Sequence, residues 1–169
     1  MNFDKFEKYY QPIQFIKTHK PKLIVEYGGG QSTYIIDKLL DELDYGGKII
    51  AFEDNKIFFD EANDKGWNYK NSIQLVESIG YTENIAGKNV NVVKYIHEYT
   101  DILNAEFVII DGPDLRRFEP YPESTMNLKE LVDLTGKEIP FWIDGRKGTQ
   151  HMYYNTLKYL LSSLVALYL

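Results

Sequence analysis

The sequence predicts an α/β fold in which a mostly parallel sheet lies between layers of helices, and three observations support this prediction. Short runs rich in Val, Ile and Phe alternate with stretches whose apolar residues recur every three or four positions. Three consecutive glycines separate the first apolar run from the first helical stretch, and carboxylates follow most of the strand-like runs. Strands that alternate with helices are typical of parallel sheets, because each parallel connection needs a crossover segment.

The first half of the chain contains three strand-like runs separated by helical patterns. The expected elements are a helix within residues 3–16, a strand over 22–27, a helix over 32–43, a strand over 48–53, a helix over 57–65 and a strand over 73–76. Pro21 limits the first helix. Ser32 is the expected N-cap of the second helix, because its hydroxyl can accept a hydrogen bond from the first turn.

The second half continues this alternation less regularly. Residues 80–100 follow neither period clearly, and residues 91–96 fit either an extra strand or one arm of a hairpin. The remaining expected elements are a buried strand over 106–111, a helix over 126–134, a strand over 139–144, a helix over 150–162 and a strand over 164–169.

Length and composition limit the functions open to this chain. With 169 residues it is expected to form one domain, residues 1–169, with residues 1–20 as an N-terminal helical extension. The absence of cysteine excludes disulfide frameworks, cysteine-based zinc sites, iron–sulfur clusters and thiol nucleophiles. A net charge of −6 argues against nucleic-acid partners, since phosphate contacts need clustered Lys and Arg. Without a signal-peptide core or a membrane-length apolar run, we expect a cytoplasmic protein with no membrane contact.

Carboxylates and turn residues follow the predicted strands, which is where parallel sheets bind ligands. The crevice in such sheets lies beyond the carboxyl ends of the strands, near the switch in strand order. The residues at these positions are Glu26, Gly28, Gly29 and Gly30, then Glu53 and Asp54, Glu77 and Ser78, Asp111, and Asp144. We therefore expect the functional site among these side chains.

The loop of Gly28, Gly29 and Gly30 predicts a close approach of the backbone to a ligand, and its neighbours restrict the ligand class. Thr33 stands where a dinucleotide-binding loop has its third glycine. Glu26 would repel a pyrophosphate, and no Gly-Lys-Ser/Thr sequence follows as it does in a P-loop. A carboxylate at this position suits a cationic ligand without phosphate.

Glu53 ends the second predicted strand, 25 positions after Gly28. A carboxylate about 20 residues beyond a glycine loop commonly accepts hydrogen bonds from ribose hydroxyls. Glu53 is therefore the expected ribose ligand, and Asp54 takes its place if the strand register is displaced by one residue.

Four motifs resemble those of the class I S-adenosylmethionine-dependent methyltransferases. They are VEYGGGQST (residues 25–33), IIAFED (49–54), FVIIDGP (107–113) and FWIDGR (141–146). The pattern E-x-G-x-G-x-S-T followed by I-D-G-P is similar to one subset of small proteins in that superfamily, and the resemblance covers about residues 20–160. It implies a three-layer, Rossmann-like methyltransferase sandwich that binds S-adenosylmethionine.

The resemblance also implies roles for individual residues. The residues expected at the methionine part of the cofactor are Glu26, Gly28, Gly29, Gly30, Gln31 and Ser32. Glu53 or Asp54 would bind the ribose, Glu77 and Ser78 would lie along the adenine, and Asp111 would sit beside the methyl group. An acid at the third strand, which the family has, is not clearly identifiable here.

The end of the chain departs from the family, because class I enzymes usually add two more strands after the fifth. Only residues 164–169 could supply one here. Either the sheet is abbreviated at the C-terminus, or its open edge is covered by a second copy of the chain, as a homodimer formed through this segment.

The expected reaction is methyl transfer to an oxygen atom of a small or sugar-like acceptor. Asp111 is the expected general base, and Asp144 and Arg146 complete the expected catalytic group. Asp111 and Asp144 could together bind Mg²⁺, but Gly145 and Arg146 stand where a third ligand is needed, so no metal is predicted. Basic residues beyond the fourth and fifth strands indicate an anionic acceptor; they are Arg116, Arg117, Arg146 and Lys147.

Two other functions remain open from the sequence. The short C-terminus favours a non-catalytic relative that keeps the fold for a structural or partner-binding role. An enzyme using a nicotinamide cofactor is disfavoured by Glu26 and by Thr33.

Overall fold

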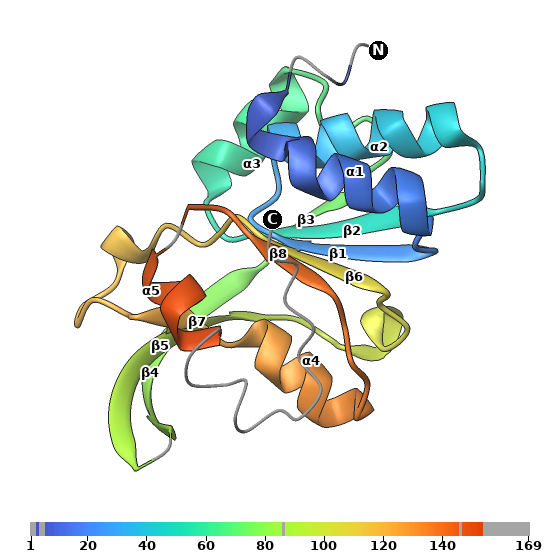
Figure 1. Ribbon diagram of the computed structural model, residues 1–169. Helices are drawn as coiled ribbons and strands as arrows, with labels where there is room; N and C mark the ends of the chain where they lie inside the picture. Colours follow the sequence, from blue (N-terminus) through green and yellow to red (C-terminus); the bar gives the residue numbers. More distant parts are fainter. Residues whose placement is uncertain (1–2, 4–5, 86, 146, 154–169) are drawn as a thin grey trace.

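A five-stranded parallel sheet forms the centre of the protein in a computed structural model, which describes residues 3, 6–85, 87–145 and 147–153 (Figure 1). Its strands are β1 (Leu23–Tyr27), β2 (Lys48–Glu53), β3 (Ile73–Leu75), β6 (Phe107–Ile110) and β8 (Phe141–Ile143). They lie in the order β3-β2-β1-β6-β8, and all neighbouring pairs are parallel. All residues of β1 and β6 are buried, which explains why both read as continuous apolar runs.

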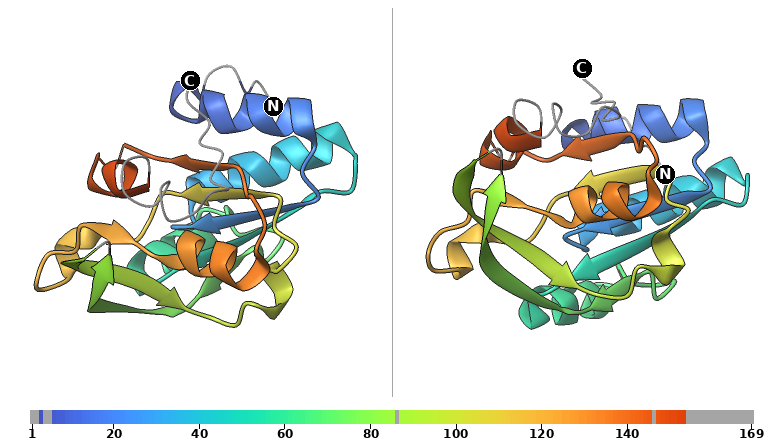
Figure 2. Two further views of the ribbon diagram at one scale, coloured as in Figure 1. Left: turned by 60° about the horizontal axis from the view of Figure 1, so that its bottom comes forward. Right: turned by 90° about the horizontal axis from the view of Figure 1, so that it is seen from below.

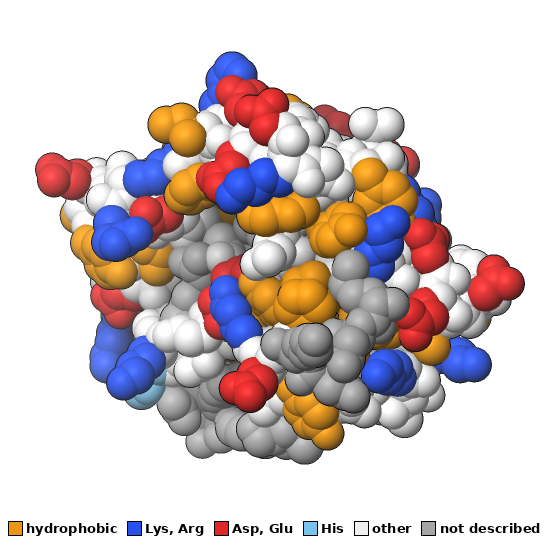
Figure 3. All heavy atoms as spheres, turned by 90° about the horizontal axis from the view of Figure 1, so that it is seen from above, with side chains coloured by type: hydrophobic (Ala, Val, Ile, Leu, Met, Phe, Trp, Pro, Cys, Tyr) orange, Lys and Arg blue, Asp and Glu red, His pale blue; other side chains and the backbone are white. Residues whose placement is uncertain are grey.

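Three helices cover one face of this sheet (Figure 1). They are α1 (Tyr10–His19), α2 (Gln31–Leu43) and α3 (Lys56–Asp64). Apolar side chains of α1 and α2 pack on Ile24, Ile49 and Phe107, and Ala62 of α3 packs on Ala51. Viewed over these helices, acidic and basic side chains are interspersed across the described surface (Figure 3).

A hairpin and a further helix cover the opposite face, so that the molecule has three layers (Figure 2). The elements on this side are β4 (Glu77–Ile85), β5 (Lys88–Ile96), β7 (Ser124–Thr125), α4 (Asn127–Thr135) and α5 (Lys147–His151). Strands β4 and β5 are antiparallel, and β7 pairs with β5. Three short 3-10 helices complete the description: η2 (Glu7–Tyr9), η3 (Thr100–Ile102) and η4 (Leu115–Arg117).

The prediction of an α/β fold with a mostly parallel sheet is confirmed, and the layering is Rossmann-like. Of the two alternatives for residues 91–96, the structure shows a hairpin arm, β5. The hairpin follows β3 directly and stands where a crossover helix would continue the alternation. Its first arm, β4, is mostly polar and buries only Ile85, which is why the sequence did not reveal it.

Two helix starts differ from the sequence predictions. Helix α1 begins at Tyr10 rather than within the first residues, and Pro12 lies in its first turn, where a missing N–H costs no hydrogen bond. Ser32 is not an N-cap, because α2 begins one residue earlier and Gly30 holds the capping position. Thr33, rather than Ser32, forms a hydrogen bond with Gly30, because its Oγ1 accepts the N–H of Gly30 at 3.0 Å.

The last predicted elements fall largely outside the described residues. Helix α5 is described over Lys147–His151, and residues 154–169, with the expected strand over 164–169 and the homodimer contact, lie beyond the described part. None of the helices within the described ranges is long and apolar enough to cross a membrane.

Candidate functional site

A crevice lies at the carboxyl ends of β1, β2 and β6, where the strand order switches direction between β1 and β6. Its volume is about 220 Å³. The crevice is lined by Tyr9, Gly28, Gly29, Gly30, Gln31, Ser32, Glu53, Phe58, Glu61, Trp67, Asp111, Gly112, Pro113 and Asp114. The structure thus brings together the predicted glycine loop, the start of α2, Glu53 and Asp111.

The first glycine of the loop is required by close packing of two backbones. The N–H groups of Gly28 and Gly29 both donate to the carbonyl of Phe52, at 2.8 and 3.1 Å. The N–H of Gly112 donates to the carbonyl of Tyr27 from the neighbouring strand end. Gly28 has a φ of +103°, and a Cβ on it would lie 2.6 Å from Gly112 Cα, so no side chain fits.

Gly30 differs from Gly28, because nothing lies within 4 Å of the place where its Cβ would be. This residue borders open space at the start of α2, and it lines the crevice. Of the three glycines, Gly30 is therefore the one that leaves room for a ligand.

Glu26 lies fully buried beneath the loop and supports it through Thr33. Its Oε2 accepts a hydrogen bond of 2.5 Å from Thr33 Oγ1, which in turn accepts the N–H of Gly30. Its Oε1 has no hydrogen-bond partner within the described part of the chain. Burial raises the pKa of this carboxyl to about 8, although the hydroxyls of Ser32 and Thr33 favour its charged form. Such a group would be stabilised in its charged form by a cation bound nearby.

Glu53 reaches the crevice from the end of β2. Its Oε1 accepts the N–H of Asn55 at 2.8 Å, and the residue is 6% exposed. Burial raises the pKa of this carboxyl to about 7, and the neighbouring charge of Asp54 acts in the same direction. Glu53 therefore sits where the sequence predicted a ligand for ribose hydroxyls.

Asp54 does not line the crevice. Its side chain is buried, accepts a hydrogen bond from Ser78 Oγ and pairs with Arg117 Nη1 at 3.1 Å. Asp54, Glu77, Ser78 and Arg117 instead line a separate depression beside β3 and β4. Glu53, the last residue of β2, faces the crevice, and Asp54, the residue that follows the strand, faces the separate depression. Asp54, Glu77 and Ser78 were expected at the cofactor and thus lie outside the crevice, and Glu26, which is fully buried beneath the loop, does not line it either.

Lys8, which sequence reasoning missed, joins the two expected catalytic acids. Its Nζ lies 3.3 Å from Asp111 Oδ2 and 3.0 Å from Asp144 Oδ2. Partial burial opposes the charge of Lys8, but the hydrogen bond to Asp144 and the charge of Asp111 raise its pKa overall. This ammonium lies where a metal ion would contact both acids, and the described residues contain no group of three metal-ligating side chains. Asp144 does not line the crevice, and Arg146 is outside the described residues.

Tyr9 and Gln11 are held at this end of the sheet by contacts with Trp142 of β8. Tyr9 lines the crevice, and its ring meets the ring of Trp142 edge-on at 6.3 Å. Trp142 Nε1 also donates to Gln11 Oε1 at 2.9 Å. These residues are 131 positions apart, so no local pattern in the sequence could have indicated the contact.

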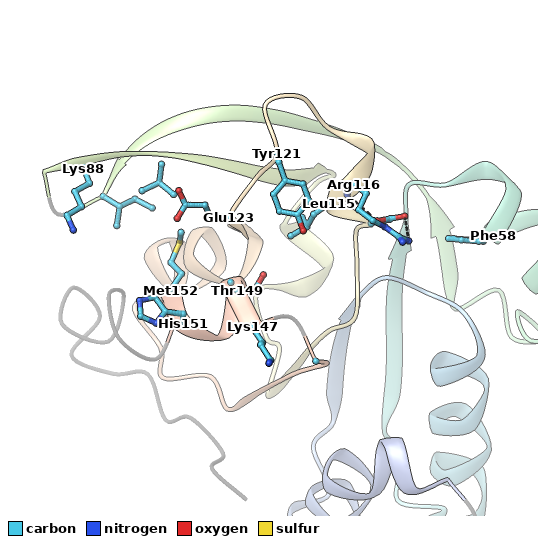
Figure 4. Close-up of a pocket in the computed structure, with 15 residues that line it drawn as sticks. Phe58, Lys88, Leu115, Arg116, Tyr121, Glu123, Lys147, Thr149, His151 and Met152 are labelled. Carbon is cyan, nitrogen blue, oxygen red and sulfur yellow. Dashed lines mark hydrogen bonds and ion pairs between the residues drawn. The ribbon is translucent and has the colours of Figure 1, made fainter.

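A larger cavity of about 940 Å³ adjoins the crevice and shares Phe58 and Asp114 with it (Figure 4). The hairpin tip, the η4 segment and α5 form its walls. Of the basic residues expected near an anionic acceptor, Arg116 and Lys147 line this cavity, whereas Arg117 lies at the other depression.

Comparison with known proteins returned no matching family model, no matching curated protein and no matching solved structure. Function is therefore argued from the residues of this site and their geometry.

Proposed function

We propose that this protein binds S-adenosylmethionine in the crevice and transfers its methyl group to an oxygen atom of a small anionic acceptor. One observation carries the proposal: the glycine loop, Glu53 and Asp111 come from three separate strand ends and line one crevice at the switch point. The motifs that contain these residues resemble the cofactor-binding motifs of the class I methyltransferases.

The charges around the crevice favour a cationic ligand over a nucleotide diphosphate. Glu26 beneath the loop, Glu53 and Asp111 are all acidic, and each would repel a phosphate. Glu26, whose Oε1 is without a hydrogen bond in the described chain, would attract the ammonium of the cofactor from beneath the loop. Glu53 would accept hydrogen bonds from the ribose hydroxyls. The open space beside Gly30 would admit the part of the cofactor that joins the ammonium to the ribose.

S-adenosylmethionine supplies a methyl group on a positively charged sulfur, which an acceptor oxygen can attack in line. Asp111 would accept the proton that the acceptor hydroxyl loses, which is the role of a general base. Lys8 Nζ lies 3.3 Å from Asp111 Oδ2 and would hold this carboxylate in place at the end of the crevice. Tyr9 lines this part of the crevice and would limit the access of water to it.

A second candidate function is a non-catalytic, partner-binding role. Lys8 already pairs with both Asp111 and Asp144, and the crevice volume of about 220 Å³ is below the roughly 300 Å³ at which ligand pockets begin. This candidate predicts that the chain binds neither S-adenosylmethionine nor its demethylated product.

Calorimetric titration with S-adenosylmethionine and with S-adenosylhomocysteine is expected to show micromolar binding of both, whereas NAD shows none. Glu53→Gln should weaken both affinities by about 10-fold, because a charged acceptor for the ribose hydroxyls is lost. Asp64→Asn, exposed at the end of α3, serves as the matched control and should bind like the wild type. Absence of binding by the wild-type chain would favour the non-catalytic role.

Asp111→Asn is expected to lower the rate of methyl transfer by about 100-fold while changing cofactor affinity by less than about 3-fold. The amide keeps the shape of the side chain but cannot accept the proton. Formation of S-adenosylhomocysteine is measured in the presence of a panel of hydroxylated acids. A variant as fast as the wild type would remove Asp111 from the role of base.

A further inference from the structure

We propose that the ion pair between Arg117 and the buried carboxylate of Asp54 fixes the position of the loop 111–118 relative to Glu53. The loop carries Asp111, and Glu53 lines the same crevice from the end of β2, so Arg117 is a positioning residue for these two acids. The effect of Arg117 on the binding of S-adenosylmethionine rests on the proposed function, whereas its effect on the loop does not.

The first half of this loop forms one wall of the crevice. Residues 111–114 are consecutive, and all four of them line it. The 3-10 helix η4 follows directly, and Asp114 begins it, because its Oδ1 accepts the N–H of Arg116 at 3.2 Å. The position of η4 therefore affects the position of this wall.

Backbone contacts fix the start of the loop to β1. The N–H groups of Asp111 and Gly112 both donate to the carbonyl of Tyr27, and Gly112 packs against Gly28. The later backbone hydrogen bonds described for the loop join its own residues, at 114 and 117 and at 115 and 118. The side chain of Arg117 provides the link from this second half of the loop to β2.

The ion pair satisfies a carboxylate that lies out of water. Arg117 Nη1 donates to Asp54 Oδ1 at 3.1 Å, and Ser78 Oγ donates to Asp54 Oδ2. The side chain of Asp54 is only 1% exposed, whereas that of Arg117 is 35% exposed. Because a buried carboxylate without its cation is costly, this pairing holds the guanidinium, and with it the end of η4, against the residue that follows β2.

The neighbouring Arg116 makes a different kind of contact. It belongs to the same 3-10 helix, but its side chain is 83% exposed. Its Nε and Nη2 donate to the carboxylate of Asp114 at 2.9 Å, only two residues away (Figure 4). This pair joins two residues of one loop and links no separate elements, so Arg116 is a matched control for Arg117.

The ion pair also contributes to the charge around Glu53, because Asp54 is the next residue. Burial raises the pKa of Glu53 to about 7, the charge of Asp54 acts in the same direction, and the charge of Arg117 opposes it. The other charged residues that line the crevice in the described part of the chain are acidic; they are Glu61, Asp111 and Asp114. Loss of the Arg117 charge should therefore raise the pKa of Glu53, which a loss of global stability alone would not do.

The position of the loop is tested by amide hydrogen exchange on the full chain without cofactor. In Arg117→Gln, exchange at Gly112 is expected to accelerate at least about five-fold more than exchange at Val108, a β6 residue whose N–H donates to the carbonyl of Pro140. Arg116→Gln should change both rates equally or not at all. Equal acceleration at Gly112 and Val108 in Arg117→Gln would show that Arg117 contributes only to global stability and would overturn the proposal.

The charge around Glu53 is tested by a carbon-13 NMR titration of its carboxyl group, again without cofactor. Arg117→Gln should raise its pKa by at least about 0.5, and Arg116→Gln should change it by less than about 0.2. The double variant Asp54→Asn/Arg117→Gln removes both charges and keeps an amide donor and acceptor, so it should restore the wild-type pKa. An unchanged Glu53 pKa in Arg117→Gln would overturn the proposal.

Cofactor affinity then connects the ion pair to the proposed function. Arg117→Gln should weaken the binding of S-adenosylmethionine about 10-fold, whereas Arg117→Lys, which keeps the charge, and the double variant should stay within about 3-fold of the wild type. An Arg117→Gln variant that binds the cofactor like the wild type would overturn the positioning role. If the exchange and titration results hold but the wild type does not bind S-adenosylmethionine, the proposed function fails and the role of Arg117 in fixing the loop stands.

Discussion

Replacing Gly28 by alanine is expected to lower the free energy of unfolding by about 3–5 kcal/mol. Two costs add at this position. The backbone has a φ of +103°, which a residue with a Cβ adopts only under strain, and the new Cβ would lie 2.6 Å from both Gly112 Cα and the carbonyl carbon of Asp111. Neither contact is with a flexible side chain that could move aside.

Urea denaturation followed by circular dichroism measures this loss, with Gly80→Ala as the control. Gly80 lies on the exposed strand β4, and the nearest atom to its added Cβ would be Phe118 Cδ1 at an ordinary 3.5 Å. The control should change stability by less than about 1 kcal/mol. A similarly small loss in Gly28→Ala would mean that the two strand-end loops are not in close contact.

The central sheet and the crevice could be predicted because their signals are local. Parallel strands buried on both faces appear as short, continuous apolar runs, as β1 and β6 do. The carboxyl ends of such strands meet at one edge, so Glu53 and Asp111 could be placed near the glycine loop without knowing any distance.

Other features depend on contacts that no local pattern encodes. Lys8 reaches Asp111 across 103 positions, and the helical spacing around it gives no sign of this ion pair. Hairpin arm β4 is largely exposed and polar, so it lacks the apolar alternation that identifies a strand. Asp54 could not be separated from Glu53, because one residue of register decides which of the two faces the crevice.

The cavity at α5 was only partly indicated by the sequence. The clustering of basic residues beyond the fourth strand predicted an anionic ligand, and Arg116 does line the cavity. However, Lys88 begins hairpin arm β5, for which the sequence left two alternatives over residues 91–96 alone, and the burial of Thr149 is not visible in the sequence. Side-chain burial and pairing are tertiary properties, so the sequence could suggest the charge of the ligand but not the residues that line the cavity.

Glu26→Gln is expected to remove most of the pH dependence of stability between pH 5 and pH 9. The folded-state pKa of Glu26, about 8, lies above its ordinary value of 4.5. Between these values the folded chain holds a proton that the unfolded chain has released, so stability is full below pH 4.5 and falls as pH rises through 8. The displacement corresponds to about 5 kcal/mol.

Between pH 5 and pH 9, the free energy of unfolding of the wild type should therefore fall by about 3–5 kcal/mol more than that of the Glu26→Gln variant. Denaturant titrations at several pH values measure both curves. Gln keeps an oxygen for the hydroxyl of Thr33, so the two proteins should be similar in stability at pH 5. Glu53→Gln is the comparison variant. The loss of stability with rising pH that it removes should be smaller and should be complete near pH 7, where the Glu53 carboxyl of the folded chain titrates. Parallel curves for the wild type and Glu26→Gln would show that Glu26 is not a buried, titrating acid.

The same titration connects stability to the proposed ligand. If an ammonium binds beside Glu26, it lowers the pKa of that carboxyl, because an opposite charge favours the ionised form. Binding of S-adenosylmethionine near pH 7 should then release up to about one proton from the wild type and none from Glu26→Gln. Calorimetry in two buffers of different ionisation enthalpy measures this release. A release that persists in the variant would place the titrating group elsewhere in the crevice, with Glu53 as the first alternative, because its pKa is also raised by burial.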